Sequence, residues 1–432
     1  MSETPRAKLI IALAVASAVA VAAGPALSQV VTDPAAPPPP AVTDPTAPPT
    51  PPKPTKPGEG PPSPFTFTAA YTADLLANLR GGQKAGPGYV DLIKLSAAYD
   101  GGNAGHEGLT GLVSVEHANG ANFTGERVGG FQSVSGSEAQ PAALRLYEVW
   151  LQREMGKGAI KAGLIDISTT FDVQETAALF LNASHGIAPE LGDTGLNGPS
   201  DYPTTALAVT TVYRPAEGWT AQLGVFDGVT GDPDHRGRFV AVKLSARDGA
   251  FVIAQLEKRF GDVARLEAGG WTYTAAFPSL VQIDAPGSPR SVRGNGGVYG
   301  LIEGRLLGGP QGNGGSLSGW LRAGVANGDI NRAETYLGGG LVYTGLIPGR
   351  EKDDIGVAFA RAGFGEGARR EGAREGLMIG GSETDLEVTY RYAFRDWLNI
   401  QPDVQYVIRP GGDQRLGNAL IIGLRLAFTV SK

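Results

Sequence analysis

The last stretch of the chain, residues 399–430, alternates strictly between apolar and polar side chains. On one face of its final segment lie Leu420, Ile422, Leu424, Leu426, Phe428 and Val430. Their neighbours, among them Gly423, Arg425 and Thr429, fall on the opposite face, because successive strand residues point to opposite sides. One apolar face and one face that can meet water are typical of a transmembrane β-barrel strand. A strand of a soluble β-sandwich alternates in the same way, so this segment leaves both classes open.

The same alternation recurs along most of the chain and decides between the two classes. Sixteen strands are expected near 65–79, 88–99, 107–117, 143–154, 158–166, 204–213, 218–227, 249–259, 263–274, 296–307, 316–327, 335–344, 353–363, 382–393, 398–408 and 418–430. Most have about ten residues, enough to cross a membrane at a tilt, whereas soluble strands are nearer five or six.

Short and long connections between these segments mostly alternate, as in outer-membrane barrels. Tight turns are expected near 156–158, 214–218, 260–262 and 394–397, and long loops near 118–142, 167–203, 228–248, 275–295 and 364–381. The sequence therefore predicts an all-β fold, a sixteen-stranded antiparallel transmembrane β-barrel. The even number of strands places both of its ends on the periplasmic side of a Gram-negative outer membrane.

The region before the barrel divides into two parts. Residues 1–28 have the basic start, the short Ala-rich apolar stretch and the small-residue cleavage site of a secretory signal peptide, which predicts a mature chain that starts near Gln29. Residues 29–64 are rich in Pro and cannot build a core, which predicts a disordered periplasmic linker. This linker is long enough to approach the cell wall, so peptidoglycan is a candidate partner. The barrel domain is then 65–432.

The composition excludes several functions. The chain has no Cys, which rules out disulfides and thiolate chemistry, and it has no internal apolar run long enough for a membrane helix. Its formal net charge of −6 argues against nucleic acid as a partner. None of the four His has the spacing of a metal site, and neither a nucleophile elbow nor a phosphate-binding loop is present. We therefore expect no enzyme activity, metal or cofactor.

Several blocks, in order, resemble the carbohydrate-selective outer-membrane porins of the OprB-like family. They include 147–148, 162–164, 179–182, 225–228, 269–271, 340–346, 383–390 and 401–412. The resemblance covers about 65–430 and implies a barrel that passes small sugars across the outer membrane. Such barrels usually end on an aromatic residue that the barrel insertion machinery reads, whereas here four residues follow Phe428. The alternatives are a general or ion-selective porin, and a structural tether between the outer membrane and the cell wall.

Strand parity gives candidate residues of the pore wall. In 143–154, Tyr147, Val149 and Leu151 are expected on the outer face, with Arg145 and Arg153 near the rims. The inward-facing candidates are Glu148, Trp150 and Gln152, then Asp385, Glu387, Thr389 and Arg391, then Asp403, Gln405 and Arg409. They supply the polar groups and the aromatic ring that a sugar site needs, although ordinary hydrated lumen residues have the same types. The direction of Tyr299, Leu301, Glu303 and Arg305 stays open.

Two loops are interpreted further. The resemblance indicates that 167–203 folds inward as a constriction, with 179–182 at its start, although a solvated surface loop is the alternative. Its candidate residues are Phe171, Asp172, Glu175, Phe180, Asn182, Asp193 and Asp201. The Gly-rich 364–381 segment is interpreted as a mobile outer loop.

Overall fold

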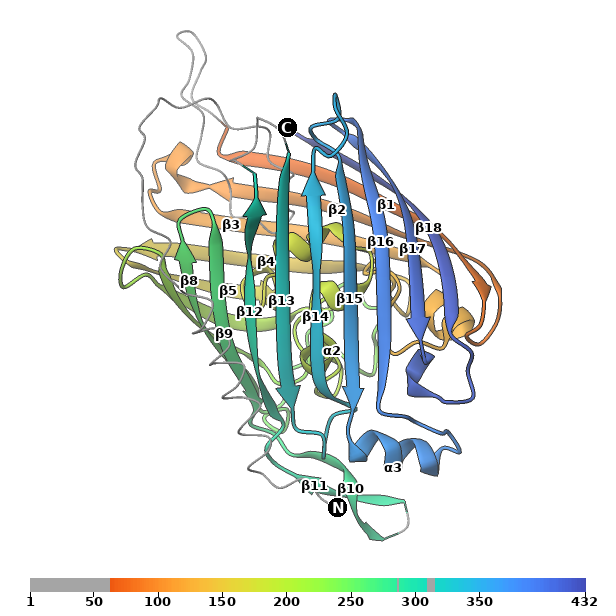
Figure 1. Cartoon of the computed structure of the whole chain (residues 1–432). Coiled ribbons are helices and arrows are strands. Elements are labelled where there is room, and N and C mark those ends of the chain that lie inside the picture. The colour runs from red at the N-terminus through yellow and green to blue at the C-terminus, as the bar shows by residue number, and fades with distance from the viewer. Residues whose placement is uncertain (1–62, 286, 309–314) are drawn as a thin grey trace.

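A computed structural model describes residues 63–285, 287–308 and 315–432, and shows a closed antiparallel barrel (Figure 1). Sixteen strands form its wall. They are β1 (Phe65–Arg80), β2 (Gly86–Asp100), β3 (Leu109–Gly120), β4 (Ala143–Met155), β5 (Gly158–Ile165), β6 (Ala206–Tyr213), β7 (Trp219–Asp227), β8 (Ala250–Phe260), β9 (Ala264–Tyr273), β12 (Gly296–Leu307), β13 (Ser316–Ala326), β14 (Ala333–Thr344), β15 (Asp354–Phe364), β16 (Ser382–Arg395), β17 (Leu398–Ile408) and β18 (Ala419–Ser431).

Each strand pairs with the next along the chain, and β18 closes the ring on β1 from Thr68↔Ser431 to Arg80↔Leu420. The predicted fold class is therefore confirmed, with strand ends within about three residues of those expected. The predicted signal peptide and Pro-rich linker lie in residues that the structure does not describe, apart from Ser63 and Pro64.

The barrel has an apolar outer face. Leu75, Leu386, Val388 and Ile422 have exposed side chains, with between 42% and 50% of their surface accessible, whereas polar neighbours such as Asp385 and Glu387 are buried inside. In a soluble protein the apolar side chains lie inside and the polar ones outside, and here the order is reversed. The reversal follows from the alternation, because lipid contacts one face of each strand and the lumen contacts the other. In the described part of the chain, no helix is long and apolar enough to cross a membrane.

The two ends of the barrel differ. Short connections, the start of β1 and the C-terminus share one end, and the longer connections gather at the other (Figure 1). The longer connections contain the hairpin of β10 (Phe277–Ala285) and β11 (Ser288–Val292), the helix α3 (Glu366–Arg374) and several short turns of helix. These turns are η2 (Thr124–Val128), η3 (Ile167–Thr169), η4 (Thr176–Leu179), η5 (Ala183–His185), α2 (Pro189–Gly192) and η6 (Pro410–Gly412), while η1 (Gly101–Ala104) follows β2.

The segment 364–381, interpreted as a mobile outer loop, lies among the longer connections and contains a regular helix. This segment forms α3, which packs on the β10–β11 hairpin. The guanidinium groups of Arg370 and Arg374 donate to the carbonyls of Val281 and Leu280, at 3.4 and 3.1 Å. The hairpin itself occupies the stretch that was expected to be a plain loop at 275–295.

A β-bulge in β4 overturns part of the predicted parity. Ser114 pairs with Glu148, but the next residue, Val115, pairs with Leu146, so Tyr147 is extra. Tyr147, expected on the outer face, and Arg145, expected near a rim, are therefore buried inside, with only 2% and 4% of their surfaces exposed. Strict alternation failed here because one inserted residue reverses the direction of every side chain beyond it.

Arg409 also lies elsewhere than predicted. It has a left-handed backbone conformation, with φ of 56°, directly after the end of β17, and its side chain is exposed. Its backbone N–H donates to Asn418 Oδ1 at 3.1 Å. The predicted strand, 398–408, ends where β17 does, but the inward face was continued one residue past it; Arg409 belongs to the connection after β17 and not to the barrel wall.

Candidate functional site in the barrel lumen

The connection between β5 and β6, residues 166–205, folds into the barrel and is fixed there by Arg322 of β13. The Arg322 guanidinium donates to both oxygens of Asp172, at 3.1 and 2.7 Å, and also contacts Glu190. All three side chains are fully buried. One wall residue thus binds two parts of the same loop, and burial makes these contacts strong.

Two wall glutamates bind the backbone of this loop. Glu303 of β12 accepts the N–H groups of Glu175 and Thr176, at 3.1 and 3.0 Å. Glu387 of β16 accepts those of Leu181 and Asn182, at 2.6 and 3.1 Å. In both cases the two oxygens of one carboxylate accept from two consecutive amides, and those of Leu181 and Asn182 are buried.

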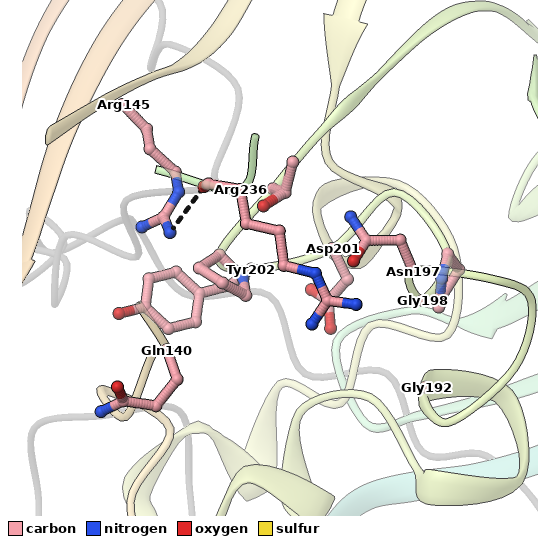
Figure 2. Close-up of a pocket in the computed structure, with 11 residues that line it drawn as sticks. Gln140, Arg145, Gly192, Asn197, Gly198, Asp201, Tyr202 and Arg236 are labelled. Carbon is pink, nitrogen blue, oxygen red and sulfur yellow. Dashed lines mark hydrogen bonds between the residues drawn. The ribbon is translucent and has the colours of Figure 1, made fainter. Parts of the chain in front are cut away.

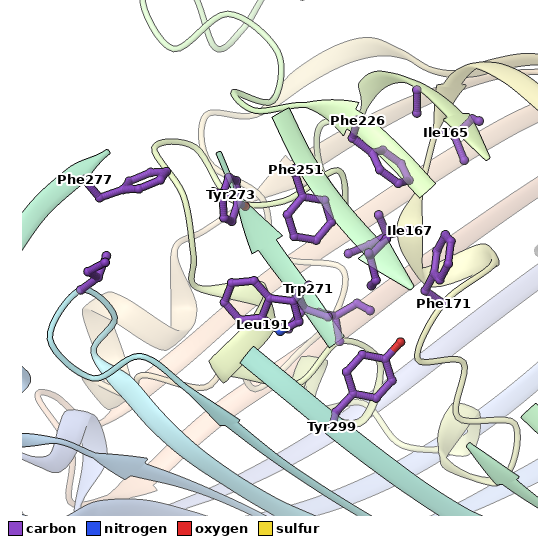
Figure 3. Packing of buried hydrophobic residues seen from close by; sticks show 14 residues of the cluster. Ile165, Ile167, Phe171, Leu191, Phe226, Phe251, Trp271, Tyr273, Phe277 and Tyr299 are labelled. Atoms are coloured by element: carbon purple, nitrogen blue, oxygen red, sulfur yellow. The ribbon is translucent and has the colours of Figure 1, made fainter. Parts of the chain in front are cut away.

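Apolar packing fixes the loop near its start and again at Leu191. Ile167, Phe171 and Leu191 lie against an inward-facing aromatic wall (Figure 3). That wall consists of Phe226, Phe251, Trp271, Tyr273 and Tyr299. The inward direction of Tyr299 also settles the open parity of β12, because Leu301 and Glu303 are buried with it. This half of the lumen is therefore filled by a packed core.

A second connection, residues 121–142 between β3 and β4, also enters the lumen. Glu383 of β16 accepts the N–H groups of Phe131 and Gln132, both at 2.7 Å. The Gln405 side chain donates to the carbonyl of Val134 at 2.9 Å. The sequence identified this stretch only as a long loop and gave no sign that it folds inward.

The two inward loops bind each other. The N–H of Gly136 donates to the carbonyl of Leu181 at 2.8 Å, and the N–H of Ala183 donates to that of Ser133 at 2.9 Å. Phe180 of the 166–205 loop packs closely against Gly356 of β15. A Cβ at Gly356 would lie 2.6 Å from the Phe180 ring, so this wall position needs a residue without a side chain. The loops therefore form one layer along the inner wall from β7 round to β18 and β1.

Accessible polar side chains remain on the wall at β4, β5 and β8. Trp150 and Gln152 of β4 are half-buried, and Lys161 Nζ lies 4.5 Å from the centre of the Trp150 ring. Glu175 of the loop is exposed and binds Arg259 of β8, with 2.5 Å between Oε1 and Nη2. An aromatic ring, an amide, an ammonium group and an ion pair therefore border the open part of the lumen.

The predicted site residues divide into three groups. Seven are buried and inaccessible to a passing solute: Glu148, Phe171, Asp172, Phe180, Glu387, Asp403 and Gln405. Four keep accessible side chains: Trp150, Gln152, Glu175 and Arg391. Arg409 lies outside the wall. Among the other loop candidates, Asn182 is buried and donates to Asp385 at 2.8 Å, whereas Asp193 is exposed and Asp201 half-buried.

Sequence reasoning missed several lumen residues, among them Lys161, Arg259 and Arg322. Strand parity was the available signal, since Arg322 follows the outward-facing Leu321 in β13. Parity shows the face on which a side chain lies, but it does not show which inward residues a loop will cover. The anchoring role of Arg322 needed the tertiary structure.

The electrostatics of the loop reflect its burial. Burial raises the pKa of Asp172 and of Glu190 above their ordinary values, and the positive charge of Arg322 opposes that rise. Burial also lowers the pKa of His185 to about 3, so this imidazole is neutral near pH 7. Within the described ranges, no group of three or more His, Asp or Glu side chains is arranged to hold a metal ion.

Comparison with known proteins gives consistent results. Residues 90–430 match the family model described as carbohydrate-selective porin, OprB family. Porin B of Pseudomonas aeruginosa is 23% identical over 396 residues, which cover 84% of this chain and 87% of that protein.

Two solved structures share the fold. The high-pH structure of Pseudomonas putida OprB has a TM-score of 0.75 and 21% identity, and the match covers 85% of this chain and 94% of that one. The low-pH structure of the same protein has a TM-score of 0.54 and 16% identity, and the match covers 85% of this chain and 92% of that one.

Proposed function

The chain belongs to the OprB family of carbohydrate-selective porins, and on that premise we propose which surface of its lumen holds the sugar. It is an outer-membrane β-barrel that lets carbohydrates diffuse passively into the periplasm. Its fold and family are those of a channel. The observation that carries the proposal is that the 166–205 loop fills much of the lumen and leaves accessible polar side chains beside it on β4, β5 and β8.

The proposed contact surface is formed by Trp150, Gln152 and Lys161 on the wall, with Glu175 and Arg259 as a second group of polar partners. A pyranose presents hydroxyls around its edge and C–H groups on its faces, so it needs donors, acceptors and a flat ring. Glu148 accepts from the Trp150 indole N–H at 3.2 Å, which fixes the orientation of the ring. Channel sites must also release their solute, so each contact should be weak.

The remaining residues predicted for the pore are assigned supporting roles in this proposal. Phe171, Asp172, Phe180 and Glu387 position the loop, and Asp403 and Gln405 support the second inward loop. Arg391 is paired with Asp354, with 2.9 Å between Nε and Oδ2, and keeps one fifth of its side chain accessible. It serves as a weaker contact on the same route.

The test is current through single channels in planar bilayers, measured with glucose. Trp150→Ala should weaken sugar block by about 1 kcal/mol, or roughly fivefold in affinity. Trp219→Ala is the matched control, because this Trp lies on the outer face, with 39% of its surface exposed. Deletion of the central part of the 167–203 loop should raise ion conductance and abolish the block. Unchanged conductance and block after the deletion would place the constriction elsewhere.

We further propose that residues 29–64 lie in the periplasm and contact peptidoglycan. The support is that β1 begins at the barrel end with the short connections, where the C-terminus also lies (Figure 1). Co-sedimentation of the full chain and of a chain lacking 29–64 with purified cell-wall sacculi tests this contact. Equal sedimentation of the two proteins would contradict it.

We also propose that Phe428 is the residue read by the barrel insertion machinery. Its ring stacks between those of Tyr71 and Trp397, with centroid distances of 6.1 Å to each, on the last strand. Phe428→Ala should reduce the amount of heat-modifiable barrel in the outer membrane. Removal of the four residues after it should leave that amount unchanged, and a loss caused by that truncation would contradict the assignment.

A further inference from the structure

A polar cavity of about 120 Å³ lies among the long connections (Figure 2), and none of its lining residues belongs to the proposed sugar contacts on the wall. We call it the vestibule pocket. Its polar lining comes from three connections and the start of β4: Gln140, Arg145, Asn197, Asp201, Tyr202 and Arg236. Its volume suits a ligand about the size of one sugar ring or smaller.

Arg145 reaches this pocket because the bulge in β4 turns it inward. Its Nη2 donates to the carbonyls of Pro141 and Arg236, at 2.8 and 3.1 Å, which fixes the guanidinium. Its Nε is buried without a hydrogen-bond partner, and only 4% of the residue is exposed. A buried, oriented donor without an acceptor is costly unless a ligand or water supplies one.

Arg236 adds a second guanidinium, which points toward Asn197 and Asp201 in Figure 2. Among residues 63–285, 287–308 and 315–432, neither Arg145 nor Arg236 forms an ion pair within 4.0 Å. The carboxylate that acts on Arg145 is that of Glu116, its cross-strand neighbour on β3, which is paired with Lys94 at 3.0 Å. The pocket therefore has two guanidinium groups without a carboxylate in contact.

Asp201 is the one carboxyl group in the pocket lining. Burial and the neighbouring carboxylate of Asp166 raise the pKa of Asp201 well above its ordinary value. This shift favours the neutral form, which donates and accepts hydrogen bonds but does not cancel the charge of the guanidinium groups. Tyr202, Asn197 and Gln140 add further groups that can bind hydroxyls.

We propose that the vestibule pocket binds acidic monosaccharides, with the carboxylate between Arg145 and Arg236 and the ring hydroxyls toward Asn197, Asp201 and Tyr202. Guanidinium groups match a carboxylate in both charge and geometry, whereas a neutral sugar offers neither of them a charged partner in contact. The proposal rests on the chain acting as a sugar porin, and it adds a site distinct from the one on the wall. The channel would then collect sugar acids at the end with the long connections before they reach the constriction.

The test compares glucuronate with glucose as blockers of single-channel current, added on the side of the long connections. Arg236→Gln should weaken glucuronate block about tenfold, the expected loss for one charge-assisted contact, and leave glucose block unchanged. Arg238→Gln is the matched control, because it removes the same charge from the same connection at a residue paired with Asp232 at 3.5 Å. It should change neither block.

Two outcomes would overturn the proposal. If Arg236→Gln weakened glucose block as much as glucuronate block, the pocket would not distinguish acids from neutral sugars. If Arg236→Gln and Arg238→Gln changed glucuronate block equally, only the general charge of the connection would matter. Glucose block reports on the wall site and should weaken in Trp150→Ala but not in Arg236→Gln. If Trp150→Ala leaves glucose block unchanged, the wall site is wrong. If Arg236→Gln leaves glucuronate block unchanged, the vestibule pocket is wrong. Arg145→Gln, checked for folding by heat-modifiable mobility, should reproduce the effect of Arg236→Gln.

Discussion

Replacing Arg322 by Met should release the inward loop from the wall while the barrel stays closed. Arg322 lies in β13, and its side chain, Asp172 and Glu190 are all fully buried. Met fills a similar volume but leaves two carboxylates in the interior without a counterion. Removing one partner of a buried ion pair costs about 3–5 kcal/mol, because the other charge is left uncompensated. The backbone pairing of β13 with β12 and β14 is untouched by this change.

That cost acts on the equilibrium between docked and undocked loop. At 1.4 kcal/mol for each factor of ten, 3–5 kcal/mol lowers the ratio of docked to undocked loop by about 10² to 4 × 10³. The expected result is higher and noisier single-channel conductance with weaker glucose block. The protein should keep its heat-modifiable mobility on gels, because the strands still form a closed barrel.

The triple variant Arg322→Met, Asp172→Asn, Glu190→Gln is the matched control. It removes the carboxylates together with the guanidinium, and neutral replacement of a whole buried charged group is often harmless. We expect conductance and glucose block near those of the unmodified protein. If the single variant folds and conducts as the unmodified protein does, the ion pairs do not hold the loop. If the triple variant is as leaky as the single one, the loss comes from packing and not from unpaired charge.

Three further predictions follow from the sequence and the fold. N-terminal sequencing of the protein from outer membranes should find a start near Gln29, and retention of Met1 would contradict the predicted signal peptide. Leu424→Arg, on the outer face of β18, should lower the free energy of unfolding by about 2–4 kcal/mol at the bilayer midplane. Thr429→Arg, on the lumen face, should leave folding, measured by heat-modifiable mobility, nearly intact. Equal damage from the two substitutions would refute the assignment of the two faces of β18. Burial lowers the pKa of His185 to about 3, although the Glu387 carboxylate lies 3.8 Å from its Nε2. Below about pH 6.5 this His therefore takes up a proton in the undocked loop but not in the docked loop. Its own contribution to docking then falls by up to about 1.4 kcal/mol per pH unit. His185→Phe should therefore show a smaller rise in conductance between pH 7 and pH 5, and an identical rise in both proteins would show that His185 is not responsible.

The sequence alone determined the barrel, because the pattern that specifies it is local. Lipid on one side and a lumen on the other require alternation along each strand, and β18 shows both faces in its own residues, from Leu420 to Ser431. Strand number and the alternation of short with long connections follow from the same pattern. Parity also gave the correct inward direction for Glu387 and Gln405, since no insertion disturbs β16 or β17 at these positions.

The tertiary structure decided what the inward residues do. Parity places Trp150 and Glu387 equally inside, but only the path of the 166–205 loop buries Glu387 and leaves Trp150 accessible. The bulge at Tyr147 could not be read from alternation, because it depends on how β3 and β4 pair. Arg322 likewise acquires its role from Asp172 and Glu190, which are 150 and 132 residues away in the chain. Local periodicity sets the face on which a side chain lies, and long-range packing sets its partner.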